Sequence, residues 1–374
     1  MLSAGQPAPV TLKLRAAFGQ RSTVRGVVRD GVPAGPSLSQ PLQQPFTLAA
    51  GPVSVGYPLT PNLRGDLTLG DPTVRLLGPL GLAQRQFTVP LTQTVQVFPD
   101  LRALTQEALA LSQAREDQAR RVLRRITEGR EFDSLREYRP GDDRRHLDWK
   151  ATARRGKPMV RTHRPERNQV VLLLLDCGRQ MSGTVNGRPK LDHAVDVALR
   201  LAKVSLDEGD LVGVMAFSTQ VLSWMPPRKG PDAMPAIARA LYRVHATLDE
   251  SDYGKAFDTA FARGSKRALV LVFTDLLDPV TSEGLVKRTL KLLPRHLPLV
   301  ASLSDQALGQ LLFEPPTTSD AALERVLAAR LDDEQRLTVA RLRDAGARVI
   351  RAPPSEFGPK VVNAYLELKN RGLL

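Results

Sequence analysis

The chain has 374 residues, of which 42% are hydrophobic and 25% are charged, and its formal net charge is +14 at pH 7. This composition is typical of a globular protein, and the length predicts two or three domains. The single cysteine, Cys177, excludes an intrachain disulfide and fits a reducing compartment. The N-terminus has no apolar run that could form a signal peptide or a membrane-spanning helix, so we expect the chain as given to be cytoplasmic.

The first 99 residues have the pattern of an all-β domain. Segments such as 10–18, 22–30 and 85–99 alternate apolar with polar residues, and Gly and Pro separate them. Short strands at this spacing predict a small antiparallel β-sandwich over residues 1–99.

Residues 100–130 change to helical spacing and are rich in Arg, Gln and Ala, which predicts a helical linker. The wider stretch 101–170 holds eighteen Lys/Arg against eleven Asp/Glu, so half of the net charge lies in under a fifth of the chain. Such a basic belt is able to attract nucleic acid, anionic lipid or an acidic partner. The interleaved acids favour internal ion pairing instead.

The stretch 131–155 is very polar, is dense in both Arg and Asp, and has Trp149 near its middle. Arg–carboxylate pairs can be bidentate and can hold irregular backbone in one shape. Two interpretations stay open: a docking collar between the domains, with Trp149 anchored against the sheet, and a partner-binding surface. The residues that we single out are Arg136, Arg139, Asp142, Asp143, Arg144, Arg145, Asp148 and Trp149.

From residue 170 onward the pattern alternates strands and helices. The segments 170–176 and 267–275 are apolar runs that each end in a carboxylate, as expected for strands buried on both faces of a parallel sheet. Amphipathic helices follow, and further strands are expected at 210–218, 297–305 and 348–352. Residues 131–374 are therefore predicted to contain a doubly wound α/β domain with a mostly parallel sheet.

Three aspartates follow predicted strands: Asp176, Asp275 and Asp278. Ligands of open α/β sheets gather at the carboxyl ends of strands, and two carboxylates on neighbouring strands could bind a hard cation such as Mg²⁺. The alternative is that each aspartate caps the following helix or accepts hydrogen bonds from loop N–H groups.

Motifs of the common enzyme classes are absent from the sequence. There is no GxxxxGK[ST] loop, no GxGxxG after a strand, no hydrolase nucleophile elbow and no HExxH pair. Cys177 has no histidine beside it in sequence, so we expect a buried small residue there. A metal-dependent phosphoester hydrolase using Asp176, Asp275 and Asp278 stays an alternative, but it lacks a clear general base.

The segment GREFDSLREYRPGDDRRHLDWKATARRGKPMVRTHRPERNQVVLLLLD resembles the signature of the bacterial domain of unknown function 58 family. The similarity extends over roughly residues 120–300. It implies a C-terminal domain similar to von Willebrand factor type A domains and association with MoxR-type AAA+ ATPases. Family members commonly have two transmembrane helices before the β domain, which implies membrane association if such a hairpin is missing from this chain.

The resemblance also implies a place for a metal ion. Type A domains often bind a divalent cation through an Asp-x-Ser-x-Ser motif, a Thr from a second loop and an Asp from a third. Asp176 and Asp275 match the first and last positions, whereas Gly178 and Gln180 replace the two serines. Near the second-loop position lie Ser251 and Asp252. We therefore expect a degenerate site that binds Mg²⁺ weakly or not at all.

Taken together, these patterns predict a non-enzymatic interaction or adaptor protein, and the family resemblance implies that it works with a MoxR-type AAA+ ATPase. Its docking face would surround the strand-end residues Asp176, Ser251, Asp252 and Asp275. Nucleic-acid binding by the 101–170 belt is a further alternative, although that belt lacks interleaved aromatic residues.

Overall fold

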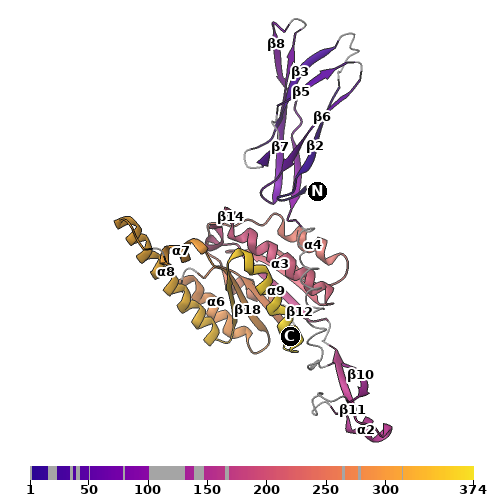
Figure 1. The fold of residues 1–374 in the computed structure, drawn as a ribbon, viewed down its shortest axis with the longest axis vertical. Helices are drawn as coiled ribbons and strands as arrows, with labels where there is room; N and C mark the ends of the chain where they lie inside the picture. The colour runs from indigo at the N-terminus through magenta and orange to yellow at the C-terminus, as the bar shows by residue number, and fades with distance from the viewer. Residues whose placement is uncertain are drawn as a thin grey trace. The chain divides into compact units, whose positions relative to one another are not determined.

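The chain divides into two compact units, Met1–Arg102 and Ala103–Leu374. The computed structural model (Figure 1) describes the residues 2–15, 23–33, 37–38, 43–49, 51–78, 81–100, 131–138, 147–164, 168–262, 266–276, 279–313 and 315–374. A linker helix was predicted over residues 100–130, and residues 101–130 lie outside the described part of the chain.

The described part of the first unit consists of strands in two sheets, as the alternating sequence pattern predicts. One sheet has the order β1-β9-β7-β3-β5, with β8 also paired to β7, and the other has the order β2-β6-β4. The strands are β1 (Leu2–Ser3), β2 (Ala8–Leu14), β3 (Val24–Gly31), β4 (Ser37–Leu38), β5 (Gln43–Leu48), β6 (Val53–Thr60), β7 (Gly65–Leu77), β8 (Gln84–Thr88) and β9 (Gln93–Phe98).

Apolar side chains of the two sheets meet in common clusters. Val28 and Val74 of one sheet belong to a buried cluster against which Val55 of the other sheet packs. A buried hydrogen bond of 2.6 Å, which the Tyr57 hydroxyl donates to Asp30 Oδ2, joins β6 to β3. Burial, together with the neighbouring Asp30 carboxylate, raises the pKa of Tyr57 well above its usual range, so the phenol keeps its proton. The assignment of this unit to the β-sandwich class stays a prediction.

The first described elements of the second unit are an antiparallel pair of strands, β10 (Glu131–Glu137) and β11 (Met159–Arg164), and a short helix, α2 (Trp149–Arg155). Asp148 caps α2 by accepting a 3.0 Å hydrogen bond from the Ala151 N–H. Trp149 is 72% exposed, so the prediction that this side chain anchors the segment against the sheet is wrong. Arg139, Asp142, Asp143, Arg144 and Arg145 lie outside the described residues, and only the backbone of Arg136, in β10, is described.

The predicted α/β sheet is confirmed, with the strand order β16-β15-β12-β17-β18-β19. All neighbouring pairs are parallel except β15 and β16. β12 is therefore the strand at which the chain order reverses, because β15 and β17 flank it on opposite sides. The strands are β12 (Val170–Asp176), β15 (Leu211–Phe217), β16 (Val221–Arg228), β17 (Ala268–Phe273), β18 (Leu297–Leu303) and β19 (Arg348–Ala352).

Helices cover both faces of this sheet (Figure 1). α3 contacts both α4 and α9 on one face, whereas α6 contacts both α5 and α8 on the other face, and α7 packs on α8. The helices are α3 (Lys190–Asp207), α4 (Ala233–Leu241), α5 (Tyr253–Phe261), α6 (Pro279–Leu292), α7 (Gln306–Phe313), α8 (Ser319–Asp344) and α9 (Pro354–Asn370). In the part of the chain that the structure describes, no helix is both long and apolar enough to cross a bilayer.

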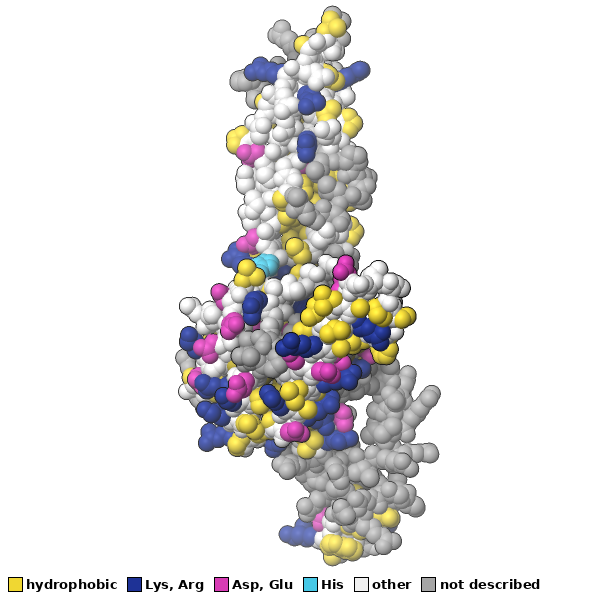
Figure 2. All heavy atoms as spheres, turned by 90° about the vertical axis from the view of Figure 1, so that its left-hand side faces the viewer, with side chains coloured by type: hydrophobic (Ala, Val, Ile, Leu, Met, Phe, Trp, Pro, Cys, Tyr) yellow, Lys and Arg dark blue, Asp and Glu magenta, His cyan; other side chains and the backbone are white. Residues whose placement is uncertain are grey.

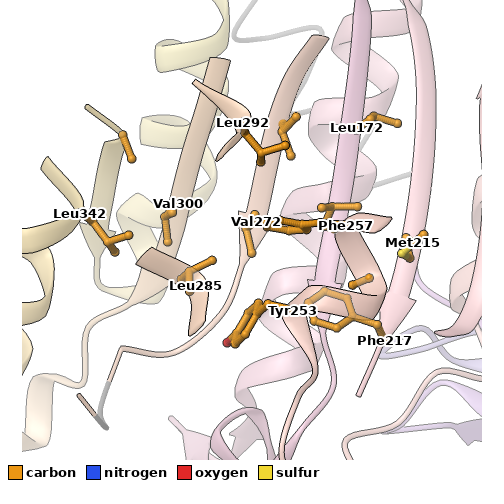
Figure 3. Packing of buried hydrophobic residues seen from close by; sticks show 14 of the residues in the cluster. Leu172, Met215, Phe217, Tyr253, Phe257, Val272, Leu285, Leu292, Val300 and Leu342 are labelled. Atoms are coloured by element: carbon orange, nitrogen blue, oxygen red, sulfur yellow. The ribbon is translucent and has the colours of Figure 1, made fainter. Parts of the chain in front are cut away.

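The core explains why the strands of this sheet are continuous apolar runs. Side chains of β12, β15 and β17, among them Leu172, Met215 and Val272, pack against Phe257 of α5 and Leu285 of α6 (Figure 3). The alternate residues of the same strands face α3 and α9, so both faces are removed from water.

The amino end of the sheet is closed by a buried ion pair. Nζ of Lys369, in α9, lies 2.7 Å from Oδ2 of Asp210, the residue that directly precedes β15. The two side chains are 3% and 0% exposed. The Tyr365 hydroxyl donates to the same oxygen at 2.6 Å, and the Gln169 N–H donates to Oδ1 at 3.2 Å. The last helix, α9, is thereby attached to the amino ends of β12 and β15.

Replacing Lys369 by methionine should destabilise the protein strongly, because the Asp210 carboxylate would stay buried without its cation. We expect a loss of about 3–5 kcal/mol in the free energy of unfolding, measured by urea denaturation followed by circular dichroism. The control is Arg371→Met, which removes an exposed pair of the same helix, Arg371–Glu367, and should cost less than about 1 kcal/mol. Equal losses in the two variants would contradict the role given to Asp210.

Candidate functional site

The candidate site lies at the carboxyl ends of β12 and β17. These strands are neighbours at the point where the strand order reverses, and such points form crevices for ligands in open α/β sheets. Asp176 is the last residue of β12, and Thr274 and Asp275 directly follow β17. Sequence reasoning placed both aspartates here, and the structure brings them to adjacent strand ends.

Four protein groups donate hydrogen bonds to the Asp176 carboxylate, which is 2% exposed. Oδ1 accepts from the Gly178 N–H at 2.8 Å and from the Ser251 hydroxyl. Oδ2 accepts from the hydroxyls of Thr274 at 2.6 Å and Tyr253 at 2.8 Å. The carboxylate therefore has two donors on each oxygen, which is how proteins stabilise an anion away from water.

Tyr253 was not predicted as a site residue, because it occurs in the sequence as an apolar position of a helix. It is the first residue of α5 and is 6% exposed, and its ring packs edge-to-face on Phe217 with centroids 5.6 Å apart. Burial is the main cause that raises the pKa of Tyr253 well above its usual value, and the Asp176 charge adds to it. The phenol thus remains a hydrogen-bond donor at neutral pH.

The segment before α5 lies against the loop that follows β12. Backbone N–H groups of Thr247 and Arg179 donate across this contact to the carbonyls of Cys177 and Asp249, at 2.7 and 2.8 Å. This pairing brings Ser251 to Asp176. Asp252 has a different role, because its carboxylate caps α5 by accepting from the Lys255 N–H at 3.0 Å.

Asp275 is held by a lysine that the sequence analysis missed. Its Oδ2 lies 2.5 Å from Nζ of Lys190, the first residue of α3, and its Oδ1 accepts from the Leu276 N–H at 2.8 Å. Burial raises the pKa of Asp275, and the Lys190 ammonium opposes that effect. A lysine in the first turn of a helix, where acidic residues are favoured, is the signal that could have identified it.

The residues present do not fit a divalent cation in this arrangement. The oxygens of Asp176 accept hydrogen bonds, and an ammonium group holds Asp275. A Cβ at Gly178 would lie 2.9 Å from the Asp249 carbonyl oxygen and nearer still to the Ser251 hydroxyl, so a serine could not stand there without a shift. No group of three or more His, Cys, Asp or Glu side chains suited to a metal occurs among the described residues.

The opening above Asp176 is very small. It leaves a volume of about 10 Å³, which is room for about one water molecule. The residues that line it are Asp176, Gly178, Arg179, Gln180, Glu250, Ser251 and Tyr253. At its rim the Arg179 guanidinium and the Glu250 carboxylate are 3.5 Å apart, and these side chains are 57% and 67% exposed.

Among the described residues, the other residues predicted for the signature segment do not line this opening. Asp148 and Trp149 belong to α2 and its cap, and Asp278 lies outside the described residues. Cys177 is fully buried, which confirms the prediction of a buried small residue.

A model of the family "Protein of unknown function DUF58" matches residues 134–334, which is more than half of the chain. This match includes the two strand ends, α3, the hairpin strand β11 and part of β10. The family prediction made from the polar signature and the following strand is confirmed.

Curated relatives include the "Uncharacterized protein Rv1480" of Mycobacterium tuberculosis and the "Uncharacterized protein Mb1516" of Mycobacterium bovis. Each is 26% identical over 158 residues, which are 41% of this chain and 49% of the relative. The chain thus spans about half the length of the curated relatives that it matches.

Similar solved structures include the SpRpn10 VWA domain and the protein BatB from Bacteroides thetaiotaomicron. Both are 14% identical, with TM-scores of 0.31 and 0.34, and they cover 53% and 54% of this chain and 95% and 98% of their own chains. An aerotolerance-related membrane protein from Bacteroides fragilis is 16% identical, with a TM-score of 0.32, and covers 54% of this chain and 99% of its own.

Placing a side chain at Gly178 should destabilise the site. Gly178→Ala should lower the free energy of unfolding by about 2 kcal/mol, because the new methyl group meets the Asp249 carbonyl and the Ser251 hydroxyl. Gly183→Ala is the matched control in the same loop, because its Cβ would meet Lys190 Cε at an ordinary 3.5 Å and its φ of −60° suits alanine. Thermal unfolding of both variants measures the difference. A tolerated alanine at residue 178 would show that this loop has room to adjust.

Proposed function

The chain belongs to the DUF58 family, and on that premise we propose that it is a non-enzymatic adaptor that works with a MoxR-type AAA+ ATPase in the assembly or maturation of other proteins. The partner class comes from the family resemblance noted in the sequence. The geometry of the strand-end site supports the absence of enzymatic activity.

The main support for the proposal is that protein groups donate hydrogen bonds to both oxygens of the Asp176 carboxylate. A carboxylate that accepts four protein hydrogen bonds is not positioned to take a proton from a substrate or to bind a metal-activated water. The opening of about 10 Å³ above it cannot hold a phosphoester, whereas pockets for small molecules are usually 300 Å³ or more. For the alternative of a phosphoester hydrolase using Asp176, Asp275 and Asp278, the two described aspartates therefore give little support.

The docking face would be the loops around the strand ends, rather than the buried carboxylates themselves. Hydrogen bonds of Asp176 to the segments of Gly178 and Ser251 hold these loops in one arrangement. Fixed loops lose little conformational entropy when a partner binds. The exposed Arg179 and Glu250 lie at the rim of the opening on this face and offer charges of both signs to a partner.

Nucleic-acid binding has less support. Much of the 101–170 belt lies outside the described residues. On the face of the α/β unit seen in Figure 2, Lys and Arg side chains are interspersed with Asp and Glu and do not form a uniformly basic surface.

We also propose that residues 1–99 form a β-sandwich. Support comes from the buried cluster around Val28 and Val74, which receives side chains from the second sheet, and from the Tyr57–Asp30 hydrogen bond between the sheets.

Charge reversal at the rim should weaken binding to the ATPase without unfolding the protein, because both side chains are exposed. We expect Arg179→Glu and Glu250→Arg each to weaken binding about tenfold, measured by biolayer interferometry with the purified MoxR-type ATPase. The double swap should recover part of the affinity if the two side chains act as a pair.

The control for this experiment is the reversal of Glu283 or Lys287, an exposed pair on α6 with a separation of 2.7 Å, which should leave binding unchanged. Unchanged affinity in both rim variants would exclude the strand-end face as the docking surface. Failure of the wild-type chain to bind the ATPase at all would contradict the proposal that a MoxR-type ATPase is the partner.

A further inference from the structure

We propose that the ammonium group of Lys190 is the resident cation of the strand-end site and replaces a divalent metal ion there, so that the docking face is assembled without metal. The inference deepens the proposed function and rests on it only for the role of this face in binding a partner. The identity of the cation concerns the protein alone.

The geometry of the pair is that of a buried, complete ion pair. Nζ of Lys190 and Oδ2 of Asp275 are 2.5 Å apart, and the two side chains are 9% and 2% exposed. Burial of either charge alone is strongly unfavourable, so each group requires the other. The second carboxylate oxygen is satisfied by the Leu276 N–H, which leaves the Asp275 charge balanced by the lysine.

The position of Lys190 in the helix supports a role beyond ordinary packing. It is the first residue of α3, where the helix dipole disfavours a positive charge. Its side chain lies among mostly apolar residues, including Met181, Ala194 and Phe357, and Asp275 carries the opposite charge among these neighbours. Its backbone N–H donates to the Gly183 carbonyl at 2.8 Å, which fixes the start of the helix relative to the loop after β12.

A metal ion and Lys190 are alternatives at this site. A divalent cation that bridged the two strand ends would need oxygens from both aspartates, yet those of Asp176 are engaged by hydrogen-bond donors and Oδ2 of Asp275 by the ammonium group. Gly178 contributes no oxygen, and the space a side chain would need there is filled by Ser251 and the Asp249 carbonyl. The lysine therefore supplies the positive charge that a metal ion would carry. The hydroxyl donors occupy the Asp176 oxygens that a metal ion would coordinate.

The test begins with Lys190→Met, which keeps the length of the side chain and removes its charge. In the full chain, the melting temperature should fall by about 10 °C, because Asp275 stays buried without the ammonium group that contacts it. The matched control is Lys203→Met, on the same helix, which removes an equally short but more exposed pair with Asp207 and should change the melting temperature by only a few degrees.

A double variant separates the charge from the packing. In Lys190→Met/Asp275→Asn the amide oxygen can still accept from the Leu276 N–H, and neither charge of the pair remains, so most of the lost melting temperature should return. Recovery in the double variant, including the case in which Lys190→Met alone does not fold, supports the ion pair. A double variant that is no more stable than Lys190→Met would overturn it.

Two further measurements identify the cation. For Lys190→Ala, ethylammonium should raise the melting temperature more than tetramethylammonium does, because only the former has N–H donors for Asp275. For the wild-type chain, neither millimolar Mg²⁺ or Mn²⁺ nor EDTA should change the melting temperature. Stabilisation of the wild type by a divalent metal, reversed by EDTA, would show that the resident cation is a metal and would overturn the proposal. These measurements use the protein alone, so their outcome is independent of whether the ATPase is the partner.

Discussion

Burial of the Asp176 carboxylate at the end of β12 organises the loops of the strand-end site. Because an ionised carboxylate away from water requires donors, three separate segments must converge on it. The loop after β12 supplies the Gly178 N–H, the start of α5 supplies Ser251 and Tyr253, and the end of β17 supplies Thr274. The Asp176 site is also connected to the hydrophobic core. The Tyr253 ring, whose hydroxyl donates to Asp176, packs on Phe217 of β15 (Figure 3).

The two aspartates of this site are stabilised in different ways. Asp176 is held by neutral donors, whereas Asp275 is held by the Lys190 ammonium. Both solutions use groups that belong to the chain. The opening above Asp176 is small, and the Arg179–Glu250 pair at its rim is exposed to solvent.

The sheet could be predicted from the sequence wherever a strand is buried on both faces. The runs that became β12 and β17 are apolar throughout and end in a carboxylate, and their identity and position are confirmed. β16 was missed because Pro226 and Pro227 interrupt its pattern, and an edge strand tolerates prolines that a central strand does not. The strands β10 and β11 were missed because their residues are polar and show no alternation that predicts a buried face.

The sequence by itself determined the α/β class, the family and the presence of aspartates at two strand ends, because apolar periodicity and local motifs are properties of contiguous residues. Only the tertiary structure decided what those aspartates contact. Lys190 is 85 residues from Asp275, and Tyr253 is 77 residues from Asp176, so no local pattern records either contact. The strand order places β12 beside β17, and α3 and α5 deliver their first residues to the same ends, so packing of distant segments turns two candidate metal ligands into an ion pair and a hydrogen-bonded carboxylate.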